Sequence, residues 1–292
     1  MARIERRLVQ NVEGDFFVDA TCIDCDACRQ IAPETFQDHG NQSSVGRQPT
    51  TPGEMHRALM ALVACPTASI GTVSRKNARD AVRSFPSNVY RNVFFCGFTS
   101  EASFGAWAYL IVRPAADGGN VLVDSPRFTV PLVKRIEDMG GISVMFLSHR
   151  DDIADHAKFA AHFGCRRVMH AADGAARLGI EQVIGGDDVV RLDQEFVVVP
   201  TPGHTRGHQV LFYREEALFS GDHLAWSPMR DTLTAFRDAC WYSWPVQTQS
   251  MRRLLDYPFE WVLPGHGRIH HAPAGEMHGH LARCIEWMGA RG

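Results

Sequence analysis

Apolar residues gather in short runs along most of the chain, and many of these runs end on a polar or ionisable residue. Such runs predict buried strands, and they lie at residues 93–98, 106–114, 120–126, 142–149, 166–173, 195–205, 208–215, 217–223 and 261–267. Segments with helical character lie between them at residues 154–164 and 248–257. Strands interspersed with helices predict a layered α/β body whose loops carry the functional residues.

The first quarter of the chain has a different pattern. A short strand is expected at residues 16–21 (FFVDAT), and an amphipathic helix is expected at residues 54–64 (EMHRALMALVA). A polar and basic stretch, SRKNARDAVRSFPSN, then separates this region from the apolar runs. We therefore predict a first domain at residues 1–74, a linker at 75–88 and a second domain at 89–292.

Composition restricts the classes of function. Hydrophobic residues make up 45% of the 292 residues and charged residues 22%, which is typical of a folded globular protein. The formal net charge of −3 gives no basic field for phosphates, so we expect a small-molecule substrate and no nucleic acid. No apolar run approaches the roughly 18 residues of a membrane span. We expect no membrane partner and a cytoplasmic location, since four of the eight cysteines are scattered singly, a placement that suits a reducing compartment.

Four cysteines form the first chemical motif. Residues 22–28 read CIDCDAC, and Cys65 is followed by a proline. Thiolates at two-residue gaps with a distant Cys-Pro are typical of an iron–sulfur cluster, whereas zinc sites more often pair two Cys-x-x-Cys hairpins. From residue 5 to about residue 74 the chain resembles a monocluster bacterial ferredoxin. The resemblance implies one 4Fe-4S cluster on Cys22, Cys25, Cys28 and Cys65, which either transfers single electrons or only stabilises a small domain.

Three further motifs follow predicted strands in the order TPGHTRGH at 201–208, GD at 221–222 and PGHG at 264–267. From about residue 89 the chain here resembles the metallo-β-lactamase superfamily, most closely its glyoxalase II-like hydrolases. The resemblance implies an αβ/βα sandwich, preceded by the small α+β ferredoxin-like domain. It also implies that His204, Asp222 and His266 bind metal, with Asp222 bridging two metals where two are bound.

The stretch SHRDDIADH at residues 148–156 matches the family motif H-x-H-x-D-H only in part. An alignment without a gap keeps His149 as a ligand and places Asp151 where the second histidine is expected, which leaves one metal. A gap of two residues restores the last pair as Asp155 and His156, which allows two metals. Both alignments stay open at this point.

Helical periodicity bears on that choice. A capping-box-like start at Ser148 predicts a helix from about Arg150, with Asp152, Asp155 and His156 on the face that packs towards the site. A divalent cation would offset such a cluster of acids, although the acids also suit a helix N-terminus. Carboxylate in place of imidazole shifts the metal preference from zinc towards iron or manganese.

We rank a metal-dependent hydrolase of an ester, thioester or lactone first. One metal is expected on His149, Asp151 or Asp152, His204 and Asp222, and a second on Asp155, His156, His266 and Asp222, with Asp155 and Asp222 as catalytic residues. The alternative is an oxidoreductase in which the cluster feeds a non-haem iron site acting on oxygen, nitric oxide or a sulfur substrate. A redox partner protein is then a candidate partner. A protein that only binds a ligand is the third hypothesis.

Overall fold

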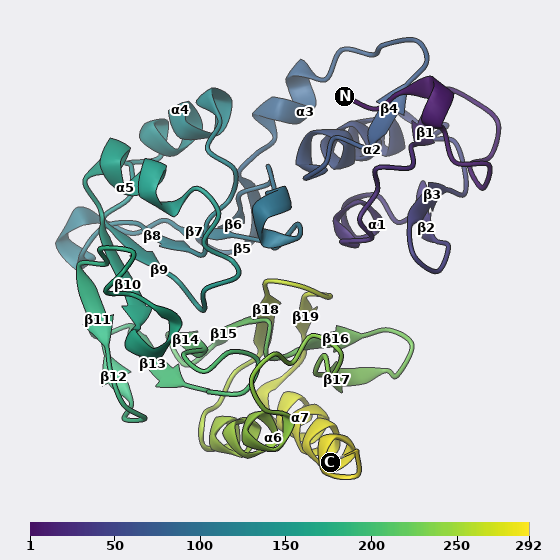
Figure 1. Cartoon of the computed structure of the whole chain (residues 1–292). Coiled ribbons are helices and arrows are strands. Elements are labelled where there is room, and N and C mark those ends of the chain that lie inside the picture. The colour runs from purple at the N-terminus through teal and green to yellow at the C-terminus, as the bar shows by residue number, and fades with distance from the viewer. Residues whose placement is uncertain (292) are drawn as a thin grey trace. The chain divides into compact units, whose positions relative to one another are not determined.

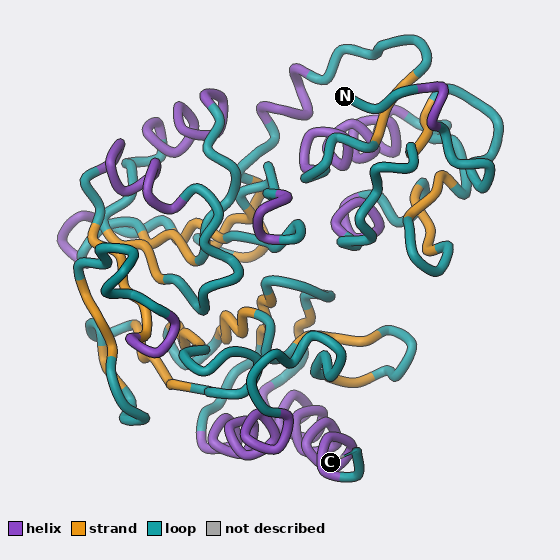
Figure 2. The backbone as a smooth tube through the Cα atoms, in the orientation of Figure 1, coloured by secondary structure: helices purple, strands orange, loops and turns teal. Residues whose placement is uncertain are grey.

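The computed structural model describes residues 1–291, and the backbone divides into two compact units. The first unit comprises Met1–Ser143 and Ala154–Gly164, and the second comprises Val144–Ile153 and Cys165–Gly292. Figures 1 and 2 show the elements along the chain. None of the helices among these residues combines the length and apolarity that crossing a membrane requires.

The beginning of the first unit is a small α+β body. The antiparallel pair β1 (Phe16–Val18) and β4 (Ile70–Thr72), the hairpin β2 (Phe36–Asp38) and β3 (Ser43–Val45), and the helices α1 (Ala27–Ile31) and α2 (Pro52–Ala64) form it. The predicted strand and helix are thus present. Helix α2 starts on a capping box in which Thr51 and Glu54 satisfy each other's backbone N–H groups. Its buried residues pack into one core with those of β1 and α1.

The remainder of the first unit holds a chain of antiparallel strands and three helices. The strands β5 (Ser87–Tyr90), β6 (Val93–Phe95), β7 (Tyr109–Ile111) and β8 (Val121–Val123) pair in succession. The helices are α3 (Arg79–Arg83), α4 (Val130–Asp138) and α5 (His156–Phe163). The predicted linker is not without structure, since it contains helix α3 and the start of β5. Ala81 of helix α3 is buried in the apolar core of the small α+β body. The domain boundary itself stays a prediction.

The second unit contains a parallel set of strands and a larger sheet. Strands β9 (Val144–Phe146), β10 (Arg166–His170) and β11 (Gln182–Ile184) run parallel. The six-stranded sheet has the order β12-β13-β14-β15-β18-β19, with β12 (Val190–Arg191), β13 (Phe196–Pro200), β14 (Gln209–Tyr213), β15 (Ala217–Gly221), β18 (Trp261–Pro264) and β19 (His270–His271). Strands β16 (Ala225–Ser227) and β17 (Thr232–Thr234) form a hairpin. The apolar runs predicted as strands all contain one.

Two helices cover one face of the six-stranded sheet. Helix α6 (Trp244–Arg253) contributes Met251, and helix α7 (Ala274–Gly289) contributes Met277 and Leu281, to an apolar core shared with Phe212 and Val262 of the sheet (Figure 1). A core of this kind holds strands β15 and β18 rigidly in place. The loops that leave these strands therefore start from fixed points.

The predicted helix start near Arg150 is wrong. Helix α5 begins at His156, and residues before it form a turn. The backbone N–H of Arg150 donates to Asp173 Oδ2 at 3.0 Å, and Ala154 has a φ of 25°, so two local features keep this stretch out of helical geometry. Asp152 consequently lies in the turn and not on the helix face that the periodicity predicted.

Candidate metal centre and cluster site

Four loops of the second unit bring ligand-type side chains together. His149 follows β9, His204 follows β13, Asp222 follows β15 and His266 follows β18. Because each loop begins at the end of a strand, the positions of these side chains are set by the strands that precede them. These are residues that the sequence motifs predicted as ligands.

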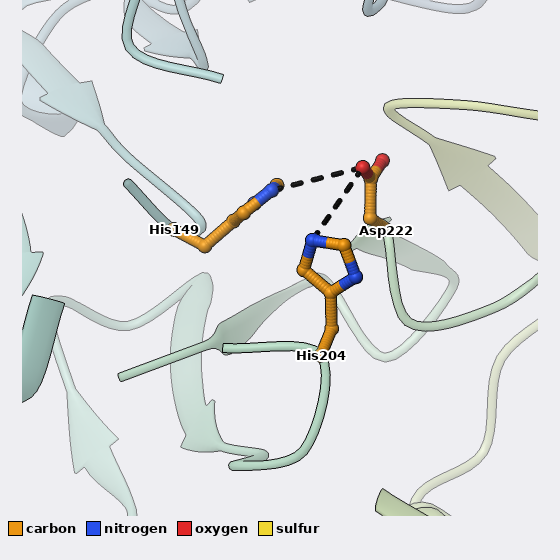
Figure 3. Close-up of side chains that lie close together, drawn as sticks. All are labelled: His149, His204 and Asp222. Carbon is orange, nitrogen blue, oxygen red and sulfur yellow. Dashed lines mark ion pairs between the residues drawn. The ribbon is translucent and has the colours of Figure 1, made fainter. Parts of the chain in front are cut away.

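The first group of ligand atoms comes from His149, His204 and Asp222 (Figure 3). Asp222 Oδ2 lies 3.7 Å from His149 Nε2 and 3.8 Å from His204 Nε2. Asp151 Oδ2 lies 3.4 Å from His204 Nε2 and 3.9 Å from His149 Nε2. Two imidazoles and two carboxylates thus face one point.

The second group comes from Asp152, Asp222 and His266. His266 Nδ1 lies 2.7 Å from Asp222 Oδ1, the oxygen that does not face His149. Gly265 provides the space here, because a Cβ at that position would lie 2.5 Å from Asp152 Oδ2 and 2.9 Å from Asp222 Oδ1. Asp222 therefore presents one oxygen to each group, as a bridging ligand does.

Burial sets the ionisation of these residues. It lowers the pKa of His149 to about 4, so the ring is neutral near pH 7 and has a lone pair for a metal. Burial alone would raise the pKa of Asp222, but the nearby His266, His149 and His204 together lower it. The contact with His204 lowers the pKa of Asp151 in the same way. The centre thus combines the neutral imidazole of His149 with carboxylates, which is the form of these groups that binds divalent metals.

The first group also passes a test of fit for a metal. His149 Nε2, Asp151 Oδ2 and both ring nitrogens of His204 are buried and make no hydrogen bond within the chain. Leaving such groups unsatisfied costs about 1–3 kcal/mol each. A divalent cation at this point would satisfy Nε2 of both rings and the carboxylate together. The residues present therefore fit one or two divalent metals.

Residues behind the ligands hold their orientation. Ser148 Oγ lies 2.9 Å from His149 Nδ1, which directs Nε2 into the centre. Asp173, which follows β10, accepts from the N–H of Arg150 at 3.0 Å, from Thr205 Oγ1 at 2.6 Å and from the N–H of Gly207 at 2.7 Å. One buried carboxylate thus joins two of the ligand loops. Asp173 was not predicted from the sequence, where its only signal is its position shortly after the strand that ends at His170.

Asp155 and His156 take no part in either group of ligand atoms. Asp155 Oδ2 accepts from the N–H of Phe128 at 2.8 Å, and Lys158 Nζ lies 2.7 Å from Asp155 Oδ1. His156 is the buried first residue of α5. The structure brings Asp151 and Asp152 to the centre instead. The predicted ligand and catalytic roles of Asp155 and His156 remain untested predictions.

Aromatic residues and further histidines lie near the ligand His204. Trp241 and Tyr242 are exposed, at 62% and 50%, and their backbone N–H groups both donate to the carbonyl of His204. Trp244, by contrast, is buried in the core. His208 bonds to Thr201 Oγ1 at 2.9 Å and stacks on the buried ring of His223. Trp241 and Tyr242, and not Trp244, thus form an exposed aromatic lip beside His204.

The four predicted cluster ligands lie around one cavity in the first unit, lined also by Val18, Ile23, Ser43 and Thr67. The N–H groups of Ser43 and Ser69 donate to the sulfurs of Cys22 and Cys65 at 3.4 and 3.3 Å. Burial raises the pKa of Cys25 to about 12, so bound metal is what would keep this thiol ionised.

Comparisons with known proteins agree with both sites. Residues 18–72 match the family described as the 4Fe-4S single cluster domain of ferredoxin I. A hydroxyacylglutathione hydrolase of Chelativorans sp. is 28% identical over 162 residues, which are 53% of this chain and 59% of that protein. The enzyme of the same name from Rhodospirillum rubrum is 33% identical over 119 residues, or 39% and 46% of the two chains. The matches therefore span about half the length of these curated relatives.

Solved structures show the fold. The BLEG-1 B3 metallo-β-lactamase superposes with a TM-score of 0.51 at 19% identity over 66% of this chain and 99% of that one. The DIM-1 metallo-β-lactamase gives 0.52 at 19% identity over 69% and 95%. The fold that the family resemblance implied is thereby confirmed. The chain combines a single-cluster 4Fe-4S domain at its N-terminus with the metallo-β-lactamase fold.

Proposed function

We propose that this chain is a metal-dependent hydrolase of small carboxylic esters, thioesters or lactones. The observation that carries the proposal is the sharing of Asp222 between two groups of ligand atoms, one with His149 and His204 and one with Asp152 and His266. Two metals held about 3.5–4 Å apart by a shared carboxylate are typical of hydrolytic sites. The relatives named hydroxyacylglutathione hydrolase favour an acyl thioester as the substrate class.

Divalent metals bound at these groups would supply Lewis acidity, which lowers the pKa of a water molecule and polarises a carbonyl group. The protein's own residues supply the geometry. Ser148 orients the ring of His149, and Asp173 keeps the loop of Asp151 and the loop of His204 in one arrangement. Because the ligand loops are braced in advance, little reorganisation is needed when a substrate binds.

The aromatic lip supports a substrate with an apolar substituent. Trp241 and Tyr242 expose their rings beside His204, and their backbone is held by the carbonyl of that ligand. The ring centroids of Trp241 and His204 lie 6.3 Å apart. We infer that these rings contact the acyl group of the substrate. We also infer a cytoplasmic location, since the four cysteines outside the cluster cavity are unpaired thiols.

An oxidoreductase is the second candidate, and Asp151 is the observation that favours it. Its carboxylate lies against His149 and His204, which makes this group harder and suits iron better than an all-histidine set would. The 4Fe-4S domain would then supply electrons, taken from a redox partner protein.

Turnover under controlled redox conditions separates the two candidates. Full-length protein with its cluster intact is given a hydroxyacyl glutathione thioester, and release of thiol is followed anaerobically with the cluster oxidised or reduced. If the chain is a hydrolase, turnover should be equal in both redox states of the cluster. His204→Ala should reduce turnover by more than the roughly 10–100-fold that follows when a residue supporting a metal ligand is changed. Turnover that requires a reduced cluster and an electron acceptor would instead establish the oxidoreductase. If neither condition gives turnover of esters, thioesters or lactones, the hydrolase proposal is wrong.

A further inference from the structure

A glycine outside the matched 4Fe-4S family region touches one of the four cluster ligands. Gly105 has a φ of +86°, and a Cβ at this position would lie 2.6 Å from Cys25 Cβ, 2.8 Å from Cys25 Sγ and 3.3 Å from Pro66 Cγ. The family match ends at residue 72. The backbone of a later segment, residues 99–107, therefore packs directly on the ligand loop.

The same segment also provides a hydrogen-bond donor for the end of helix α2, which lies directly before the cluster ligand Cys65. Helix α2 ends at Ala64, next to Cys65, and the last carbonyl groups of a helix have no partner within it. Thr99 Oγ1 donates to the carbonyl of Ala64 at 2.7 Å in a buried hydrogen bond, and Arg127 Nη2 donates to the carbonyl of Val63 at 3.3 Å. The cationic side chain of Arg127 is also favourable at the negative end of the helix.

Residues 99–107 are held in a defined conformation. The N–H of Gly105 donates to the carbonyl of Ser100 at 2.8 Å, and the N–H of Ala106 donates to the carbonyl of Ser103 at 2.8 Å. Trp107 stacks on Phe95 of β6 with ring centroids 3.7 Å apart. A segment braced in this way presses a fixed surface, not a mobile loop, against Cys25.

We propose that residues 99–107 are part of the cluster site and close it on the side of Cys25. The cluster is then not a detachable ferredoxin module, because its solvent exposure and the position of one ligand depend on a segment outside the matched residues 18–72. Exposure and packing around the sulfurs are among the features that set the reduction potential of such clusters. Electrons from outside would have to enter on another side of the cluster, away from Cys25. The proposal rests on the 4Fe-4S match and does not depend on the hydrolase activity.

The full-length protein offers a matched pair of variants. Gly105→Ala and Gly40→Ala both place a side chain at a similar positive φ, +86° and +88°, but a Cβ at Gly40 would meet nothing within 4 Å. Both variants therefore place a side chain at a similar positive φ, and only the Cβ of Gly105→Ala would meet the Cys25 sulfur. Iron and sulfide analysis measures the cluster content. Electron paramagnetic resonance and the midpoint potential report on the environment of the cluster. The rate at which a chelator bleaches the protein shows how well the cluster is protected from solvent.

We expect Gly105→Ala to lower cluster content or, where the cluster assembles, to shift its spectrum and potential and to speed bleaching several-fold. Gly40→Ala should match the wild-type protein. If Gly105→Ala and Gly40→Ala agree in content, spectrum, potential and bleaching rate, the proposal is overturned.

A second variant keeps the test decisive if Gly105→Ala does not fold. Thr99→Val has a similar shape but removes the hydrogen bond to the carbonyl of Ala64, and circular dichroism reports whether it is folded. Folded Thr99→Val should lose its cluster faster than the wild-type protein, because the helix end beside Cys65 is no longer satisfied. An unchanged bleaching rate in this variant would contradict the proposal.

Discussion

His266 Nδ1 lies 2.7 Å from Oδ1 of Asp222, while the other oxygen of the same carboxylate faces His149 and His204. The two oxygens of one side chain thus belong to two different groups of ligand atoms. Variants of the ligands should therefore change how many metals are bound, and not only whether metal is bound.

Removal of a ligand from the first group should reduce metal binding. His149→Ala and His204→Ala each take away a buried imidazole whose Nε2 has no other partner. The remaining ligands then offer poor geometry, so non-cluster metal should fall to well below wild-type occupancy. Elemental analysis after dialysis measures it. His271→Ala, at an exposed position in β19, is the control, and full occupancy in both ligand variants would refute the assignment.

Variants of Asp152 and Asp155 test which of the two carboxylates binds the second metal, Asp152 as the structure indicates or Asp155 as the gapped alignment predicts. Asp152 lies in the second group with Asp222 and His266, whereas Asp155 accepts the N–H of Phe128 and pairs with Lys158. Asp152→Asn should lower the number of non-cluster metals from two towards one. Asp155→Asn should leave that number unchanged and cost at most about 1 kcal/mol of stability. The reverse pattern in metal analysis would restore the gapped alignment.

Filling the space at Gly265 should displace the second metal. The Cβ of Gly265→Ala would lie 2.5 Å from Asp152 Oδ2 and 2.9 Å from Asp222 Oδ1, so these carboxylates must move apart. We expect this variant to bind one metal fewer. Turnover should fall by roughly tenfold or more, as it does when the support of a metal ligand is disturbed. Gly275→Ala in α7, where a Cβ meets nothing within 4 Å, should behave as wild type. Two metals retained in Gly265→Ala would contradict the position of the second group.

The cluster should depend on four cysteines and not on the others. Cys28→Ser and Cys65→Ser remove buried thiols from the cluster cavity, so the brown colour and the paramagnetic signal of the reduced protein should be lost or damaged. Cys165→Ser changes a cysteine outside this cavity and should leave the signal intact. A colourless protein with one tightly bound zinc and no iron would show that the cavity holds zinc.

The sequence alone determined the strand-end motifs and the four cysteines. Motifs such as TPGHTRGH and PGHG predict their own loops, because a proline, a glycine and a strand end specify the local backbone. The family resemblance that these motifs carry implied that His204, Asp222 and His266 belong to one centre. The spacing of Cys22, Cys25 and Cys28 predicted a cluster for the same reason, since all three lie on one short loop.

Only the tertiary structure decided which acids reach the centre. The periodicity of SHRDDIADH favoured a helix from about Arg150, but Asp173, which lies 23 residues later than Arg150, accepts its N–H and holds the stretch in a turn. Asp152 then meets Asp222 and His266, and Asp155 bonds to Phe128. The contact between Gly105 and Cys25 was hidden for the same reason. Local patterns specify local backbone, whereas contacts between distant segments depend on how the whole chain packs.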